Sequence, residues 1–247
     1  MKITVAETIL AAVTNPLQIK NLVRGAWWVV AAAAASGCGG RQHPQEPEPT
    51  APLPTSGIAA QQVSLLPLTL VAAEEALHWD SLFAERRVAL AKCDSVIATL
   101  LVARVPEVTW VLPEELRRAA RRAPGVVPNP DHMGSTILLH GTNREPEMVP
   151  DPLRSELRTL SALAGGRYAL IPAGLVYRRI VGQSDGVTTQ HPTVRPSDRP
   201  TAAAELTVVM VDVRTGRVDF RTVARGEGAD PWAALTRAVK SLTPGVP

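Results

Sequence analysis

Three side chains in the middle of the chain are of types that bind metal ions or act as acids and bases. Asp131 and His132 are adjacent, and His140 follows eight residues later in a stretch rich in proline, glycine and asparagine. A carboxylate and two imidazoles could hold a zinc ion or serve a hydrolase or transferase. The other histidines are scattered, and no His-Glu-x-x-His spacing occurs. We therefore expect these histidines to be solvated loop residues without a metal ion. The alternative is a hydrolase or transferase whose active site does not follow a known motif.

No motif for covalent or phosphate chemistry is present: Ser-x-x-Lys, Gly-x-Ser-x-Gly and Gly-x-x-x-x-Gly-Lys are all absent. Cys93 lies on an apolar stripe with helical spacing, which favours a core thiol over a nucleophile. Asp212 could be a buried acid, but its position before a tight turn favours a carboxylate that caps the turn. Trp79 and Trp110 could line a glycan groove, although core aromatics are commoner. We expect no catalytic residue and no cofactor.

The second cysteine, Cys38, ends a short apolar run. Residues 26–37 are twelve apolar or small residues, and the basic residues Lys20 and Arg24 precede them. About 20 apolar residues are needed to cross a bilayer as a helix, so this run is too short for a stable anchor. Basic residues followed by an apolar run and then by small residues are the layout of a secretory signal peptide. We therefore assign residues 1–37 to a signal peptide and exclude them from the fold.

Two alternatives remain open for this region. The run could be a buried alanine-rich helix that carries a stray cysteine. The stretch from Met1 to Leu22 is also longer than a typical basic leader. Either the leader is extended, or the true start lies downstream, near Val23.

The residues around Cys38 resemble a bacterial lipobox, which has a small or aliphatic residue and two small residues before cysteine. Here these are Ala35, Ser36 and Gly37. The resemblance implies cleavage between Gly37 and Cys38, with Cys38 lipidated (palmitate among its acyl chains) and first in the mature chain. An aspartate after the cysteine usually retains such proteins at the inner membrane. Gly39 therefore implies anchoring at the outer membrane, on its periplasmic face.

Residues 38–60 form a segment of different composition, which we predict to be a disordered tether. Its prolines are at positions 44, 47, 49, 52 and 54. Such a stretch cannot bury enough apolar surface to offset its ordering entropy, and proline favours extended conformations. Composition alone indicates a linker, and its place after the cysteine indicates a tether.

Residues 61–247 are long enough for one domain with a real core. The formal charge of the chain is +3, of which the signal segment carries +2, so the rest is close to neutral and nucleic acid is not an expected partner. Arg117, Arg118, Arg121 and Arg122 indicate a solvated helix face. With one cysteine besides Cys38, no intramolecular disulfide framework is available to the mature chain.

Periodicity predicts a single α/β (α+β) domain with a mixed sheet, in the order β-α-β-α-α-β-β-β-α. The expected strands are 62–68, 108–112, 168–181, 206–213 and 217–225. The expected helices are 80–102 (capped by Asp80), 114–123, one that Asp151 caps and that ends at Gly165, and one from Asp230. The first two strands should be parallel through a right-handed crossover, and the last three antiparallel.

Turn and loop residues refine this prediction. Gly216 can take the positive φ of a bulged hairpin turn. Residues 205–211 are almost continuously apolar, so this strand should be covered on both faces. The stretches 124–147 and 182–200 read as a loop and a polar excursion, and both are candidate working surfaces together with the wet face of the last hairpin.

Three segments carry a second resemblance: Leu65-Leu66-Pro67-Leu68 before a long helix, the strand 167–173, and the hairpin 209–218 with Asp212 and Gly216 at its turn. Together they look like the periplasmic α/β domain shared by the curli-secretion lipoprotein family, the activator lipoproteins of penicillin-binding proteins, and the amino-terminal domain of the Tol translocation protein. The resemblance covers about residues 61–244, by pattern rather than identity.

The resemblance implies a non-catalytic envelope protein that binds other envelope proteins or assembles with copies of itself. It offers no catalytic residues to carry over. Prolines 192, 196 and 200 oppose the strands of a transmembrane pore. A periplasmic hydrolase and a small-molecule or glycan-binding lipoprotein are the alternatives.

Overall fold

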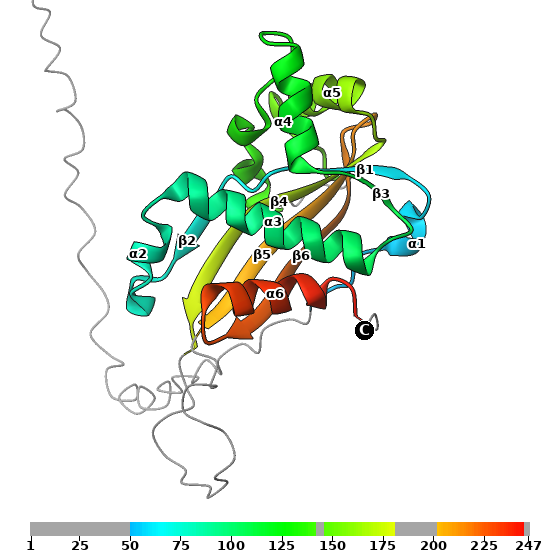
Figure 1. The fold of residues 1–247 in the computed structure, drawn as a ribbon. Helices are drawn as coiled ribbons and strands as arrows, with labels where there is room; N and C mark the ends of the chain where they lie inside the picture. Colours follow the sequence, from blue (N-terminus) through cyan, green and yellow to red (C-terminus); the bar gives the residue numbers. More distant parts are fainter. Residues whose placement is uncertain (1–49, 142–145, 181–201, 245–247) are drawn as a thin grey trace, which may run out of the picture. The chain divides into compact units, whose positions relative to one another are not determined.

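The computed structural model describes residues 50–141, 146–180 and 202–244. They form a six-stranded mixed sheet in the order β3-β1-β4-β5-β6, with β2 also paired to β4 (Figure 1). The strands are β1 Gln62–Leu65, β2 Val71–Ala73, β3 Thr109–Val111, β4 Tyr168–Arg179, β5 Ala202–Asp212 and β6 Arg217–Gly228. The α-helices are α1 Thr55–Ile58, α2 Asp80–Phe83, α3 Arg86–Arg104, α4 Pro113–Arg122, α5 Leu153–Ala164 and α6 Pro231–Ser241. The 3₁₀ helices are η1 Glu75–Leu77, η2 Pro130–His132 and η3 Ser135–Leu139.

The strand pairing confirms the mixed α/β fold that periodicity predicts. β1 pairs with β3 in parallel, and α3 lies between them in the chain. β4, β5 and β6 form an antiparallel meander. β1 also pairs in parallel with β4, which joins the two halves into one sheet.

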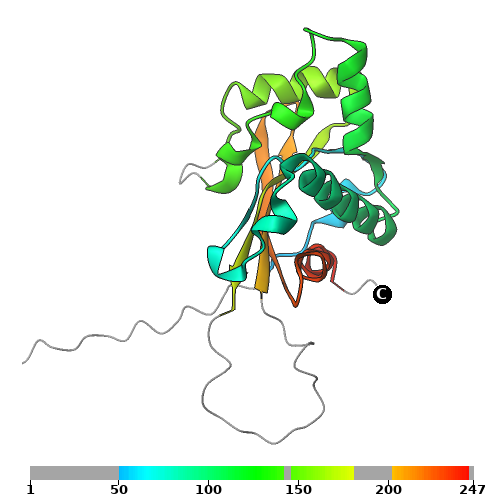
Figure 2. The same ribbon diagram turned by 60° about the vertical axis from the view of Figure 1, so that its left-hand side comes forward.

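Side chains of β5 alternate between two apolar cores. Leu206, Val208 and Met210 belong to a cluster with residues of α3 and α6, whereas Val209 and Val211 belong to one with residues of α4 and α5. Because both faces are covered, β5 is almost continuously buried, as its near-unbroken apolar sequence predicts. Figure 2 shows α3 and α6 together on one side of the sheet.

Several local predictions are confirmed at the ends of the elements. Gly216 has φ +79° in the β5–β6 turn, and Gly165 has φ +84° at the end of α5. The Asp230 carboxylate accepts hydrogen bonds from two N–H groups in the first turn of α6. The expected helix over 114–123 is present as α4, which Pro113 opens and which has acidic residues in its first turn.

The expected helix over 80–102 is divided, and Asp80 is the first residue of α2 rather than its cap. The Phe83 ring stacks on Tyr177 of β4, with 5.6 Å between ring centroids, and Trp79 meets the same ring edge-on. These contacts turn α2 toward the sheet, so tertiary packing overrides local helix propensity. Similarly, α5 begins one residue later than an Asp151 cap would place it, with Pro152 as the N-cap residue.

Residues 50–60 differ from the predicted tether because they lie against the domain. Leu53 and Ile58 are buried in the core that contains α3 and α6. The Leu53 N–H donates to the carbonyl of Leu242 after α6, at 2.8 Å. Two apolar side chains thus recover enough burial to order a proline-rich stretch. The sequence pattern does not predict β2. This strand is only three residues long, too short for an alternation of apolar and polar residues to be recognised.

Residues 1–37 and the excursion 182–200 fall outside the described residues. No helix among the residues that the structure describes has the length and apolar character required to span a membrane.

The contact of α6 with β6 depends on glycine. A Cβ built on Gly226 would collide with the backbone of Ala234 and Ala238 in α6, and Gly228 meets the same helix. The Gly226→Ala variant should therefore lose about 3 kcal/mol of unfolding free energy through overpacking. Gly57→Ala is the matched control, because a Cβ there meets nothing within 4 Å. Urea denaturation of both variants measures this, and equal stability would contradict the close approach.

Candidate binding cleft

A cleft of about 870 Å³ lies between the first turns of α3, helix α4 and the loop that contains η2. Its apolar lining is Leu68, Leu90 and Ala91. Its charged lining is Arg86, Arg87, Glu114, Arg117 and Asp131, with His132 beside them. This volume is in the range of small-ligand and peptide-binding clefts.

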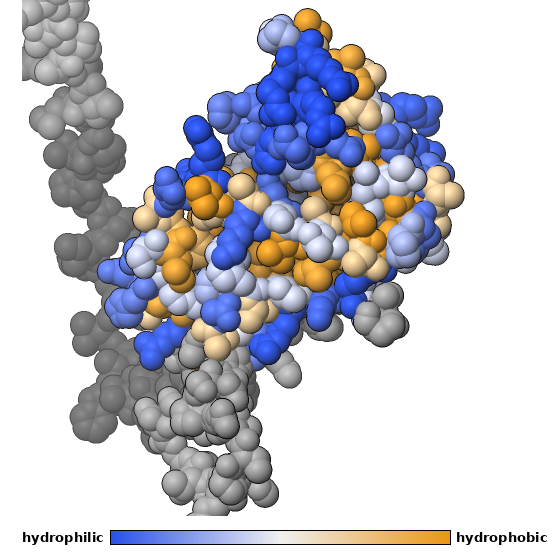
Figure 3. Space-filling view, in the orientation of Figure 1, coloured by the Kyte–Doolittle hydropathy of each residue, from blue (hydrophilic) through white to orange (hydrophobic). Residues whose placement is uncertain are grey.

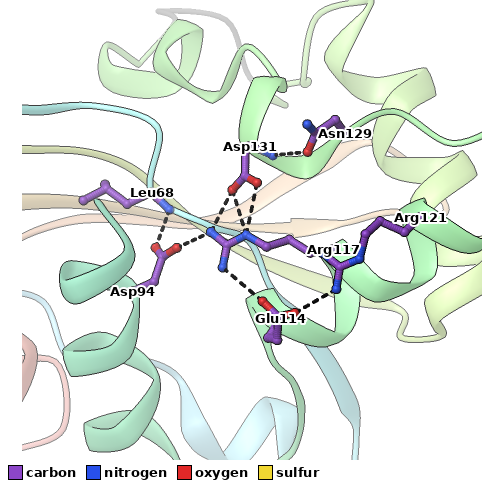
Figure 4. Close-up of polar contacts among 7 residues, drawn as sticks. All are labelled: Leu68, Asp94, Glu114, Arg117, Arg121, Asn129 and Asp131. Atoms are coloured by element: carbon purple, nitrogen blue, oxygen red, sulfur yellow. Dashed lines mark hydrogen bonds and ion pairs between the residues drawn. The ribbon is translucent and has the colours of Figure 1, made fainter. Parts of the chain in front are cut away.

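Arg117 of α4 crosses to α3 and joins the walls of the cleft (Figure 4). Its Nη2 donates to Asp94 Oδ2 at 2.6 Å, while the other oxygen of Asp94 accepts the Leu68 N–H at 2.8 Å. Asp94 is 5% exposed, so an unpaired carboxylate there would be costly. These two bonds tie α3 to α4 and to the segment that follows β1.

The same guanidinium also holds the η2 turn. Arg117 Nε and Nη2 donate to Asp131 Oδ1 at 2.9 and 2.7 Å. Asn129 caps η2 by accepting the N–H of Asp131, which fixes the carboxylate toward Arg117. The Arg117 guanidinium therefore links α3, α4, η2 and, through Asp94, the segment after β1. The carboxylates of Asp94 and Asp131 are both engaged in these bonds.

The charges of this network depend on one another. Burial raises the pKa of Asp94, while the Leu68 N–H and the Arg117 guanidinium act to lower it. Burial alone would lower the pKa of Arg117, but its hydrogen bonds to Asp131 and Asp94 raise it. Arg117 thus stays charged. At the rim, Arg121 hydrogen-bonds Glu114 at 2.9 Å and lowers the pKa of Glu114.

The structure does not assemble the hypothetical metal site. Asp131 and His132 line the cleft and are exposed, whereas His140 does not line it. The Asp131 carboxylate faces a guanidinium, which would repel a metal cation. Among the described residues, no three His, Cys, Asp or Glu side chains are grouped to hold a metal ion.

The prediction that the four arginines of α4 form a solvated face is wrong for one of them, Arg117. Arg118, Arg121 and Arg122 are exposed, but Arg117 is only 19% exposed in its side chain. Three carboxylates surround it, from Asp94, Glu114 and Asp131. One feature of the sequence could have revealed the role of Arg117. Asp94 is an acidic residue on the apolar stripe of α3, and a buried carboxylate requires a positively charged partner.

Asp212 is the turn-capping carboxylate that its position predicts. Its Oδ1 accepts the N–H groups of Arg214 and Thr215, and its Oδ2 accepts two hydrogen bonds from Arg167. Burial alone would raise the pKa of Asp212, but these bonds hold it below its usual range. Its lone pairs are thus used to fix the hairpin.

Cys93 belongs to the core that contains α3, and the half-buried Trp79 and Trp110 pack against it. Cys93 is fully buried, and burial, with Asp94 adding to it, raises the pKa of its thiol to about 12. Trp79 packs on Tyr177, and Trp110 donates its indole N–H to the carbonyl of Val105 at 3.2 Å. A core role is therefore confirmed for Cys93, and the tryptophans serve in packing against that core. Gly37 and Cys38 lie outside the described residues.

No protein-family model matches the chain, and neither does any curated protein. Solved structures resemble it only distantly. The LpoB C-terminal domain from Salmonella enterica has 14% identity and a TM-score of 0.32, covering 68% of this chain and 82% of that one. A PelC dodecamer from Paraburkholderia phytofirmans has 12% identity and a TM-score of 0.32, covering 78% and 94%. Escherichia coli LpoB, solved by NMR, has 15% identity and a TM-score of 0.29, covering 91% and 92%. Likenesses this distant carry no conclusion about function.

Removing the central cation should expose the cost of burying Asp94. Arg117→Met keeps the aliphatic stem but leaves the Asp94 carboxylate without its ion-pair partner, so we expect a loss of about 3 kcal/mol in unfolding free energy. Asp94→Asn in the same background should recover part of it, giving a coupling energy above about 1 kcal/mol in a double-mutant cycle. Additive losses would mean that the two side chains do not stabilise each other.

Asp212→Asn should destabilise the protein in a pH-dependent way. The lowered pKa of Asp212 means that its charge stabilises the fold above the unfolded-state value of about 4, and that this contribution fades as pH falls through the folded-state value. We expect wild type to exceed Asp212→Asn by about 1–2 kcal/mol at pH 7. The gap should shrink below about pH 4. Denaturation from pH 7 to 3 measures it, with the exposed Asp80→Asn as control; a constant gap would contradict the assignment.

Proposed function

We propose that this chain is a lipid-anchored protein of the bacterial cell envelope whose α/β domain acts by binding another protein. In this proposal Cys38 is the lipidated first residue of the mature chain. The absence of aspartate at Gly39 favours the outer membrane, with the domain on its periplasmic face. The domain works without cofactor or metal.

The stretch from Ala35 to Cys38 carries the proposal. Small residues directly before a cysteine, at the end of a twelve-residue apolar run, are what a signal peptidase that cuts at a lipid-modified cysteine requires. Several acyl chains, at about 0.8 kcal/mol per buried methylene, would make the anchoring effectively stable.

The length of chain after Cys38 limits where the domain works. The first described residue, Thr50, is held by hydrogen bonds to β6. Residues 39–49 can span at most about 40 Å when fully extended. The near edge of the domain would therefore stay within about 40 Å of the membrane surface, and the partner must be able to reach the domain there.

Binding, rather than catalysis, fits the described cleft. The carboxylates of Asp94, Glu114 and Asp131 are paired with arginines, and no carboxylate of the described residues lies within ion-pair distance of His132. A general base needs an available, positioned proton acceptor, and these groups are used in holding the walls together. Cys93 is enclosed and protonated at neutral pH.

Replacing Cys38 tests the anchor. Cys38→Ser should leave the folded domain unchanged, since Cys38 precedes the domain that the sequence predicts and serine is close to cysteine in size, but abolish lipidation and cleavage at this position. Mass spectrometry of the mature amino terminus and membrane fractionation measure both effects. A mutant with the same amino terminus and membrane association as wild type would overturn the lipoprotein proposal.

In-cell cross-linking of the tagged full-length protein tests the binding role. A reproducible envelope protein among the captured chains would support the proposal and identify the partner. Self-links alone would indicate a homo-oligomer. Capture of nothing above background would count against a protein-binding role and favour ligand or activity screens.

A further inference from the structure

The cleft beside Arg117 is lined by two arginines, Arg86 and Arg87, that have no ion-pair partner among the described residues. Arg86 Nη2 donates to the carbonyl of Thr69 at 2.8 Å, and Arg87 is exposed. No carboxylate of the described residues forms an ion pair with either guanidinium. In contrast, each carboxylate at the cleft is paired with Arg117 or Arg121. Arg117 is shared by two carboxylates, but the lining as a whole still carries three arginines (Arg86, Arg87 and Arg117) against two carboxylates (Glu114 and Asp131), an excess of one positive charge.

The position of these cations favours a ligand that carries negative charge into the cleft. Arg86 and Arg87 are the first two residues of α3, where the helix dipole adds positive potential. Guanidinium groups bind carboxylates through paired, charge-assisted hydrogen bonds. The surface over α4 is strongly hydrophilic (Figure 3).

The lining is too large and too apolar for a single small anion. Its volume is about 870 Å³, and Leu68, Leu90 and Ala91 contribute apolar surface beside the arginines. A carboxylate or phosphate alone would leave that apolar surface in contact with water. An extended segment that carries both acidic and apolar side chains would use both kinds of lining.

The cleft is also held in shape before a ligand arrives. Its walls come from α3, α4, η2 and the segment after β1, and the hydrogen bonds of Asp94, Arg117 and Asp131 join all four. A site with fixed walls loses little conformational entropy on binding. The Arg117 network thus prepares the cleft without itself being a free binding group.

We infer that this cleft, with Arg87 at its mouth, docks an acidic, partly apolar peptide segment of the partner protein. This rests on the proposed function in that the ligand is part of a protein. The network of Asp94, Arg117 and Asp131 shapes the cleft, the apolar residues receive the apolar side chains, and Arg86 and Arg87 receive the carboxylates.

The test uses the full-length protein in detergent and a fluorescein-labelled hexapeptide, Glu-Leu-Glu-Glu-Leu-Glu, followed by fluorescence anisotropy. Arg87→Glu should weaken binding by at least about tenfold, because it replaces an attracting charge with a repelling one. Arg87→Lys should restore most of the affinity. Arg122→Glu is the matched control, because Arg122 is an exposed arginine of α4 that does not line the cleft.

Several outcomes would overturn the inference: no binding of the hexapeptide, equal binding of Gln-Leu-Gln-Gln-Leu-Gln, or equal weakening by Arg87→Glu and Arg122→Glu. Competition by free glutamate as strong as by the peptide would assign the cleft to a small anion instead. In cells, a partner captured equally by wild type and Arg87→Glu would refute this cleft but leave the proposed function standing. If neither wild type nor Arg87→Glu captures any partner, the proposed function itself would be refuted.

Discussion

The elements that enclose the cleft are arranged around the ion pair between Asp94 and Arg117. A carboxylate that is 5% exposed can remain charged only with a cation and a donor beside it, and here these are Arg117 and the Leu68 N–H. To supply the cation, α4 must lie across from α3. To complete the guanidinium, η2 must place Asp131 against it. One buried charge thus determines the separation of the elements that enclose the cleft.

Much of the fold could be predicted because its signals are local. The alternation along β5, the proline that opens α4, and the aspartate that caps α6 each depend on residues a few positions apart. Asp212 belongs to the same group, since its turn-capping bonds reach only Arg214 and Thr215. Sequence patterns of this range survive in the folded chain because tertiary contacts reinforce them.

What could not be predicted depends on partners far away in the chain. Arg117 reads as one of four solvated arginines until Asp94, 23 residues earlier, is seen opposite it. The break before α3 is set by Phe83 stacking on Tyr177, in a strand that begins over eighty residues later. The cleft is the sum of such long-range contacts, so its residues were predicted singly and for other roles.

The bonds that fix the first described residues have a mechanical consequence. Thr50 is bonded to β6, and Leu53 is bonded to the residue that follows α6 and is buried beside it. Tension applied through the preceding chain would therefore enter the domain at the edge strand and the last helix together. A force along that path would act on Leu53 and its buried contacts before it acts on the short helix α1. From there the load passes to the walls around Arg117 through α3, because Arg104 of α3 hydrogen-bonds Thr243 just after α6 and both helices pack with Leu53 in one apolar core.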